Sequence, residues 1–323
     1  MKKLDLRKES NKIDLHSFDN APVISCKNLT KDYGNQRGIF DLNLDIYKGE
    51  TVGYVGTNGS GKTTTIRNIM GFLKPTSGSV SVLGMDSWKN SYEIKKYIGY
   101  IPGEIAYPGV KTGDEFLKIQ AEFWGVKDLT YVNEIINILQ LDTSANLKRM
   151  SKGMKQKTAI VAALMNDPPI LVLDEPTTGL DPLMRDSFME IILNEKKRGK
   201  TIFMSSHIFE EIEIACDRVG LIKDGTLVDM TSMSTITNND VRTYNIEFLT
   251  MDDYEEFIKK NFDFEKLLPE HKRVVINIKD ENVRNMFVAL QGLNVKFISE
   301  TKYTLDKYFE NLFNSEKGAG YDK

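Results

Sequence analysis

The sequence has few cysteines, no long apolar stretch and no signal segment, three features that often indicate the class of a protein. Its 323 residues include only two cysteines, Cys26 and Cys216, and their spacing fits no metal-binding motif. We therefore expect two small buried residues in a protein of a reducing compartment, most simply the cytosol. No apolar stretch approaches the ~20 residues of a membrane span, and the first twenty residues contain no apolar signal segment. These features predict neither secretion nor a membrane-spanning helix.

An excess of charge of one sign is also missing. The 43 Lys and Arg residues and the 46 Asp and Glu residues leave a net charge of −3, so we expect no general basic surface and no nucleic-acid partner. The composition, 41% hydrophobic and 28% charged, is that of an ordinary globular protein. The length allows one large domain and one small one.

One motif limits the chemistry tightly. The segment 56–63 reads GTNGSGKT, a complete phosphate-binding loop that follows an apolar strand, Thr51–Val55, and opens into a helical pattern. In such a loop the backbone N–H groups surround phosphate oxygens, the lysine meets the β- and γ-phosphates and the hydroxyl after it ligates Mg²⁺. The residues expected to bind a nucleoside triphosphate are Gly56, Thr57, Asn58, Gly59, Ser60, Gly61, Lys62, Thr63 and Thr64.

Short apolar strands and helical patterns alternate around this loop, which predicts an α/β core. The expected strands are Ile39–Tyr47, Thr51–Val55, Ser79–Leu83, Ile98–Ile101, Ile170–Leu173, Thr201–Met204 and Arg218–Ile222, with Leu227–Met230 returning as a hairpin after the turn at 223–226. Between about Thr112 and Asn166 the pattern is helical, and we interpret its apolar positions, including Phe116, Ile119 and Phe123, as core.

The composition along the chain predicts its domain boundaries. Residues 1–20 resemble a flexible tail, residues 21–231 form the nucleotide-binding domain, and the polar stretch 232–240 has the composition of a linker. Residues 241–323 contain three strand-like runs, at 243–248, 273–278 and 295–299, with helical patterns between and after them. They predict a small α+β domain.

A second motif indicates hydrolysis. The apolar strand Ile170–Leu173 ends in Asp174 and Glu175, and carboxylates at such a place must be paired or bound to metal. Asp174 is placed to hold Mg²⁺, while Glu175 points to the other side and can deprotonate a water for in-line attack on the γ-phosphate.

Together these residues resemble the ATP-binding cassette (ABC) ATPases. Met150-Ser151-Lys152-Gly153-Met154 stands where that family carries its LSGGQ signature, and matches it at Ser151 and Gly153. From the sequence alone Ser151 is a good N-cap for the helix that follows. The resemblance implies in addition that this helix points at the γ-phosphate bound by a second subunit.

Other matches follow in the family's order. Asp181 lies in a segment that resembles the D-loop, and His207, at the end of a strand, stands where the family places its switch histidine. The resemblance implies that His207 contacts the γ-phosphate and couples to Glu175. It also implies that Tyr33 stacks on adenine, although a lone aromatic is more often core.

The sequence departs from the family at Gly103, where a glutamine that contacts Mg²⁺ is usual. Glycine offers no side-chain oxygen, so this ligand is water, a neighbour such as Glu104, or absent. Because Lys62, Asp174, Glu175 and His207 are intact, we favour a variant with working ATPase activity.

The resemblance implies an ABC ATPase fold, with an antiparallel β subdomain and a helical signature subdomain, that binds ATP and Mg²⁺. It further implies pairing with a second ABC ATPase subunit, identical or different, and a separately encoded membrane permease on the inner face of the cell membrane. The C-terminal domain resembles the accessory domain of drug-, bacitracin- or lantibiotic-type exporter subunits. An importer subunit, a soluble ABC ATPase uncoupled from transport and an inactive adaptor are the alternatives.

Overall fold

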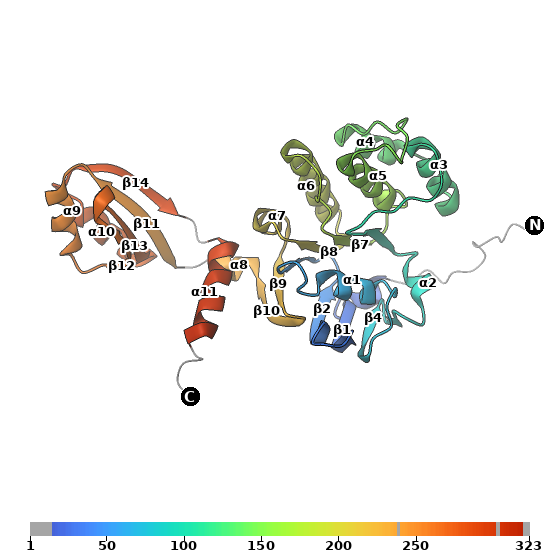
Figure 1. Ribbon diagram of the computed structural model, residues 1–323, viewed down its shortest axis with the longest axis horizontal. Coiled ribbons are helices and arrows are strands. Elements are labelled where there is room, and N and C mark those ends of the chain that lie inside the picture. The colour runs from blue at the N-terminus through green and yellow to red at the C-terminus, as the bar shows by residue number, and fades with distance from the viewer. Residues whose placement is uncertain (1–14, 238–239, 302–303, 319–323) are drawn as a thin grey trace, which may run out of the picture. The chain divides into compact units, whose positions relative to one another are not determined.

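The computed structural model describes residues 15–237, 240–301 and 304–318, and the chain divides into two compact units, Met1–Thr231 and Ser232–Lys323 (Figure 1). Each unit has its own sheets and core. Within the described ranges, no helix is both long and apolar enough to cross a bilayer.

A six-stranded sheet forms the centre of the first unit. Its strand order is β10-β9-β3-β8-β7-β6, and the strands from β9 to β6 run parallel. Their residues are nearly all buried because helices cover such sheets on both faces. The strands are β3 (Thr51–Val55), β6 (Ile98–Ile101), β7 (Ile170–Asp174), β8 (Thr201–Ser206), β9 (Arg218–Lys223) and β10 (Thr226–Ser232), at the positions that the apolar pattern predicts.

A smaller antiparallel sheet, in the order β2-β1-β4-β5, lies on the other side of helix α1 (Figure 1). It comprises β1 (Pro22–Asp32), β2 (Gly38–Tyr47), β4 (Ser77–Val82) and β5 (Met85–Asp86). Helix α1 (Lys62–Ile69) contacts strands of both sheets, and one apolar cluster joins all three layers. The α/β core with an antiparallel β subdomain is therefore confirmed, although the apolar pattern alone did not reveal β1 or β5.

The predicted helical section is also confirmed. Its helices are α3 (Gly113–Trp124), α4 (Thr130–Ile138) and α5 (Lys152–Leu164), and α2 (Ser91–Ile94), α6 (Pro182–Lys197) and α7 (Phe209–Ala215) complete the unit. The assignment of Ile119 and Phe123 to the core is wrong, because they are 45% and 62% exposed. The buried side of α3 instead carries Phe116, Leu117 and Ala121, so the apolar residues of this helix do not all share one face.

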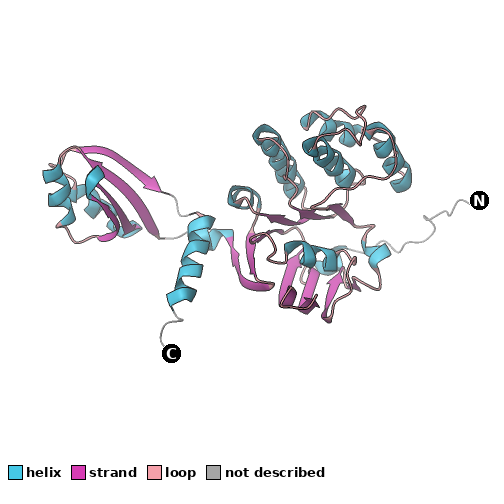
Figure 2. Ribbon diagram, in the orientation of Figure 1, coloured by secondary structure: helices cyan, strands magenta, loops and turns pink. Residues whose placement is uncertain are grey.

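The second unit is an α+β fold, as predicted. Its sheet has the order β12-β13-β11-β14 with all neighbours antiparallel, and α9 packs on β11 and β13 (Figure 2). The elements are α8 (Met233–Thr237), β11 (Val241–Phe248), α9 (Met251–Ile258), β12 (Asp263–Leu268), η2 (Pro269–His271), β13 (Arg273–Lys279), η3 (Asp280–Asn282), α10 (Val283–Ala289), β14 (Val295–Thr301) and α11 (Leu305–Gly318).

Two expectations about irregular segments need correction. The stretch predicted as a linker contains α8, in which Met233 and Ile236 are buried, so these two apolar residues give a polar segment a packed helical turn. Of the predicted tail, residues 1–14 lie outside the described ranges, but η1 (Leu15–Phe18) is a short 3-10 helix whose Phe18 packs on the core. A single apolar residue thus orders the end of the polar segment.

The parallel sheet yields a test of core packing. Phe203 on β8 is fully buried, with its ring centroid 5.3 Å from that of Tyr54 on β3. We predict that Phe203→Ala lowers the free energy of unfolding by about 3–5 kcal/mol, because the transfer energy is lost and a cavity remains. Phe123→Ala, at an exposed phenylalanine, should change it by less than about 1 kcal/mol. Urea unfolding of both variants measures this, and equal losses would contradict the packing described.

Candidate functional site

The phosphate loop joins β3 to α1, and within it the backbone N–H of Ser60 donates to the carbonyl oxygen of Thr57 at 3.1 Å. Gly59 and Gly61 have φ angles of 84° and 115°, which glycine adopts without strain. A Cβ at Gly61 would also lie 2.6 Å from the Ile39 side chain. Gly61 is the N-cap of α1 and supplies no side-chain cap, so the first N–H groups of this helix remain available to an anion.

Lys62 lies in the middle of this loop, almost completely buried. Its Nζ donates to the carbonyl oxygens of Gly56, at 2.6 Å, and Thr57, at 3.2 Å, and lies 3.4 Å from Oε1 of Glu175. A buried ammonium needs such partners. A triphosphate would offer it stronger, charged acceptors at the same place.

Asp174 ends β7 with no exposed surface. Its Oδ1 accepts a hydrogen bond from Oγ of Ser205 on β8 at 2.8 Å, whereas its buried Oδ2 has no hydrogen-bond partner among the described residues. A Cβ at Gly103, just after β6, would lie 3.1 Å from this Oδ2. Gly103 therefore lies beside this unpartnered carboxylate oxygen but has no side chain with which to bind it.

Glu175 is turned away from Asp174 by its backbone. Its φ of 48° lies in the left-handed region, which costs a non-glycine residue on the order of 1 kcal/mol. The backbone N–H of Glu175 donates to Ser205, whose carbonyl oxygen lies at 3.2 Å and Oγ at 3.0 Å. Its carboxylate is partly exposed and lies 3.3 Å from Nδ1 of His207. The chain thus brings the two predicted partners, Glu175 and His207, together.

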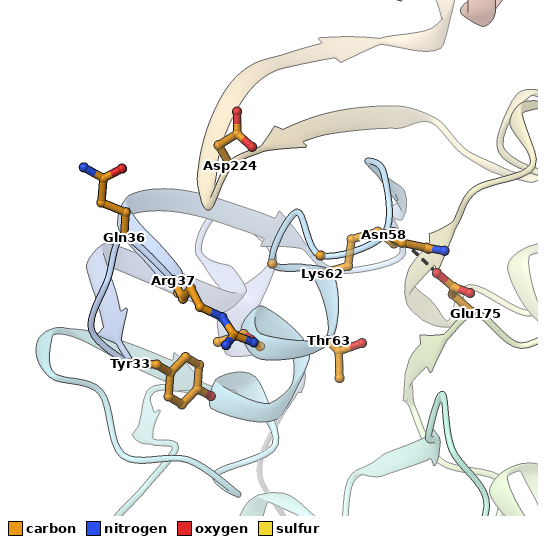
Figure 3. A pocket seen from close by; sticks show the side chains of 12 residues that line it. Tyr33, Gln36, Arg37, Asn58, Lys62, Thr63, Glu175 and Asp224 are labelled. Carbon is orange, nitrogen blue, oxygen red and sulfur yellow. Dashed lines mark ion pairs between the residues drawn. The ribbon is translucent and has the colours of Figure 1, made fainter.

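The loop, Lys62 and Glu175 line a cavity of about 550 Å³ (Figure 3), a volume within the range of small-molecule sites. Tyr33 lies on its wall and is 54% exposed, so it is not a core residue. Its role toward adenine stays a prediction.

Four residues that line this cavity were not predicted from the sequence: Gln36, Arg37, Gly38 and Asp224. Arg37 points across the cavity toward Thr63, whereas Gln36 points away (Figure 3). The available signals were weak. Arg37 is a cation in the short loop after Tyr33, and Asp224 belongs to the turn at 223–226, which predicts a hairpin and no ligand.

The predicted signature residues lie apart from this cavity within one chain, since neither Ser151 nor Gly153 lines it. Ser151 is the N-cap of α5, as predicted, with Oγ accepting from Met154 N at 3.2 Å. A Cβ at Gly153 would lie only 2.7 Å from the carbonyl oxygen of Gly179. Asp181, two residues further on, caps α6 by accepting from Met184 N at 3.0 Å.

Buried Gln156 adds a link between α5 and the acidic strand end. Its Nε2 donates to the carbonyl oxygen of Pro176 at 2.7 Å, directly after Glu175. The start of α5, the segment after Glu175 and the start of α6 are therefore packed into one unit.

The described residues contain no group of three or more His, Cys, Asp or Glu side chains able to hold a metal ion. They do offer Asp174 Oδ2 and the hydroxyl of Thr63, which lines the cavity. Mg²⁺ commonly takes only one or two protein ligands together with phosphate oxygens and waters. The residues present fit such an ion.

Both cysteines are buried and free, as predicted. Burial raises the pKa of Cys26 to about 12 and that of Cys216 also well above its usual value. Both thiols therefore stay protonated at neutral pH, and neither serves as a nucleophile.

Comparison with known proteins gives one consistent result. The family profile described as ABC transporter matches residues 39–178. The chain is 32% identical to the bacitracin transport ATP-binding protein BcrA of Bacillus licheniformis, over 90% of this chain and 97% of that protein. It is 34% identical to the linearmycin resistance ATP-binding protein LnrL of Bacillus subtilis, over 64% of this chain and 68% of that protein.

Solved structures agree with the sequence relatives. An ATP-binding subunit of an ABC transporter superposes with a TM-score of 0.60 at 30% identity, covering 66% of this chain and 91% of its own. A dimeric, post-hydrolysis structure of the ATP-binding cassette MJ0796, bound to ADP and Pi, superposes with a TM-score of 0.58 at 25% identity, covering 65% of this chain and 98% of its own.

The close approach at Gly153 is open to test. We predict that Gly153→Ala lowers the free energy of unfolding by about 1–3 kcal/mol, because the new methyl group meets the Gly179 carbonyl. Gly109→Ala is the matched control, since a Cβ there meets nothing within 4 Å, and its effect should stay within about 0.5 kcal/mol. Chemical denaturation measures both, and an unchanged Gly153→Ala protein would rule out the contact.

Proposed function

The chain belongs to the ABC transporter family and is an ATP-hydrolysing subunit, and from this premise we propose that it drives an exporter. The single observation that carries the proposal is the cavity at the strand ends, where the phosphate loop, Lys62 and Glu175 meet. Similarity to bacitracin transport and linearmycin resistance proteins favours export over import. It also favours a transporter subunit over a soluble ATPase or an inactive adaptor.

In this proposal the chain holds ATP by its phosphates. The N–H groups from Gly56 to Thr64 surround the phosphate oxygens at the positive end of α1. Lys62 leaves its loop carbonyls for the β- and γ-phosphates, which are stronger acceptors for an ammonium. Tyr33 stacks on adenine, and Arg37 faces the phosphates from the opposite wall.

Glu175 is the base that takes a proton from the attacking water. Its left-handed backbone, held by Ser205, sets the direction of the side chain, and the hydroxyl of Thr178 donates to the carboxylate at 3.4 Å, so the base is oriented before the reaction. His207 lies beside it and is placed to contact the γ-phosphate and to keep the carboxylate oriented.

We propose Mg²⁺ as the resident ion, with Thr63 and Asp174 as the residues that would hold it. When bound, such an ion neutralises charge that develops on the phosphate oxygens. Gly103 supplies no side-chain ligand, and in this proposal a water takes the place of the family's glutamine side chain.

A second copy or a related subunit completes the site. The N-terminus of α5, capped by Ser151, suits a phosphate anion, yet Ser151 and Gly153 line no part of this chain's own cavity. We propose that they act on the nucleotide of the partner, with Asp181 near the interface. The dimeric ATP-binding cassette MJ0796 supports this arrangement.

The proposed membrane partner is a separately encoded permease that holds the chain at the inner face of the membrane. A groove of about 290 Å³ lies between the core and the helical section and is lined by apolar residues, including Phe72, Ile105, Tyr107, Phe116 and Trp124. It supports docking of an apolar helix. The hydroxyl of Tyr107 donates to the Lys155 carbonyl at 2.6 Å and so joins this groove to α5. For residues 241–323 we propose an accessory role.

Two substitutions test the assignment of the base. Glu175→Gln keeps the shape of the side chain but cannot take the proton, so we predict hydrolysis to fall at least about 100-fold while ATP binding persists and an ATP-bound dimer accumulates. Lys62→Ala should instead lose nucleotide binding. Phosphate release, labelled-ATP titration and gel filtration distinguish the two losses, and steady turnover by Glu175→Gln would overturn the assignment.

A charged residue in this groove should abolish binding of the membrane partner without affecting ATP binding. Ile105→Asp places a charge among apolar residues, so we expect the membrane partner to be lost in co-purification from detergent extracts while ATP binding remains. Leu129→Asp, at an apolar residue that is 40% exposed and outside the groove, is the matched control and should retain the partner. Failure of the unaltered chain to recover any membrane protein would contradict the transporter proposal.

A further inference from the structure

Glu211 is a buried carboxylate that the mechanism above does not use. It lies on α7 (Phe209–Ala215), four residues after His207, and is only 4% exposed. Its Oε2 accepts a hydrogen bond from Oγ of Ser206 at 2.8 Å, and its Oε1 is buried without a hydrogen-bond partner among the described residues. An incompletely satisfied carboxylate in the interior is costly, so stability does not explain it.

The serine that Glu211 binds holds the backbone around the histidine. Ser206 is buried at the end of β8, in register with Val55, the residue before the phosphate loop. Its Oγ accepts from the backbone N–H of Ile208 at 3.0 Å while it faces Oε2 of Glu211. The peptide that follows His207 is therefore tied to the Ser206 hydroxyl, which donates to the carboxylate of Glu211.

The side chain of His207 makes few contacts of its own. Its side chain is 53% exposed, and its one polar contact recorded in the described part of the chain is that with Glu175. The place of the imidazole therefore depends on the backbone from Ser206 to Ile208. A displacement of about 1 Å in a catalytic geometry can lower the rate by up to about 100-fold.

A second buried glutamate, Glu195, differs from Glu211 in its partners and serves as a comparison. Glu195 is 1% exposed, pairs with Arg198 at 2.8 Å and with Lys200, and accepts from the hydroxyl of Tyr131 at 2.7 Å. Glu211 has no such cationic partner in the recorded ion pairs of the described residues. Its one hydrogen bond goes to the strand end that carries the catalytic histidine.

We propose that Glu211 is a positioning residue for ATP hydrolysis, which acts through Ser206 to hold His207 against Glu175 and the γ-phosphate. The inference rests on the proposed function and adds to it a residue outside the nucleotide cavity. Ground-state binding of ATP, which depends on the phosphate loop, should be nearly independent of Glu211.

The test uses the full-length chain and measures kcat, KM and ATP affinity. Glu211→Ala should lower kcat by about 10- to 100-fold, with the affinity for ATP changed by less than about 3-fold. Glu211→Gln retains an oxygen that accepts from Ser206 and should recover most of the rate. Glu210→Ala, at the exposed neighbour on the same helix, is the matched control and should be fully active.

A double-mutant cycle with His207 separates positioning from a general structural role. If Glu211 acts through His207, Glu211→Ala should cost almost nothing further in a His207→Ala background. Additive losses, a Glu211→Gln variant as slow as Glu211→Ala, or an unaltered kcat would each overturn the proposal. Should Glu211→Ala fail to fold, Ser206→Ala, which removes the hydroxyl that Glu211 binds, gives the same comparison in the His207→Ala background. An unaltered chain without ATPase activity would refute the proposed function instead.

Discussion

The functional site depends on the register of three parallel strands. On β8, Ser205 lies opposite Asp174 of β7 and Ser206 lies opposite Val55 of β3, directly before the phosphate loop. Parallel strands end at the same edge of a sheet. The phosphate loop, the acidic pair and His207 follow these strand ends, so the register of the strands places them close together. A shift of one residue on β8 that placed Met204 opposite Asp174 would remove the hydroxyl that Asp174 and Glu175 share.

Ser205 is central to this arrangement because one hydroxyl serves two adjacent carboxylate residues in different ways. It donates to Oδ1 of Asp174 and accepts from the backbone N–H of Glu175. The first bond orients a side chain toward the expected ion, and the second stabilises a left-handed backbone that turns the next side chain toward Lys62 and His207. In a regular strand the side chains of Asp174 and Glu175 would also point to opposite faces, but no hydrogen bond from Ser205 would hold them in place.

Structural features that depend on a few consecutive residues could be predicted from the sequence. The phosphate loop, the acidic strand end and the cap by Ser151 are of this kind, since each depends on local backbone chemistry. Three failures have a different physical origin. Tertiary packing decides which apolar residues of α3 are covered, and Ile119 and Phe123 are not. Arg37 and Asp224 reach the cavity only through folding, and β12 is a largely exposed strand with a weak apolar pattern.

The divergent signature can be understood from the packing of its glycine. A Cβ at Gly153 would lie 2.7 Å from the carbonyl oxygen of Gly179, so this position has no room for a side chain unless the backbone moves. Lys152, in contrast, is exposed and lies along the surface of Gly179, where a long flexible side chain can adjust. The cap at Ser151 and the close contact at Gly153 are therefore constrained by the fold of this chain alone, before any nucleotide or partner subunit is considered. Of the departures from the family pattern, Lys152 stands at an exposed position at the start of α5, the end of the helix proposed to meet the second nucleotide, whereas Met150 is buried in the core.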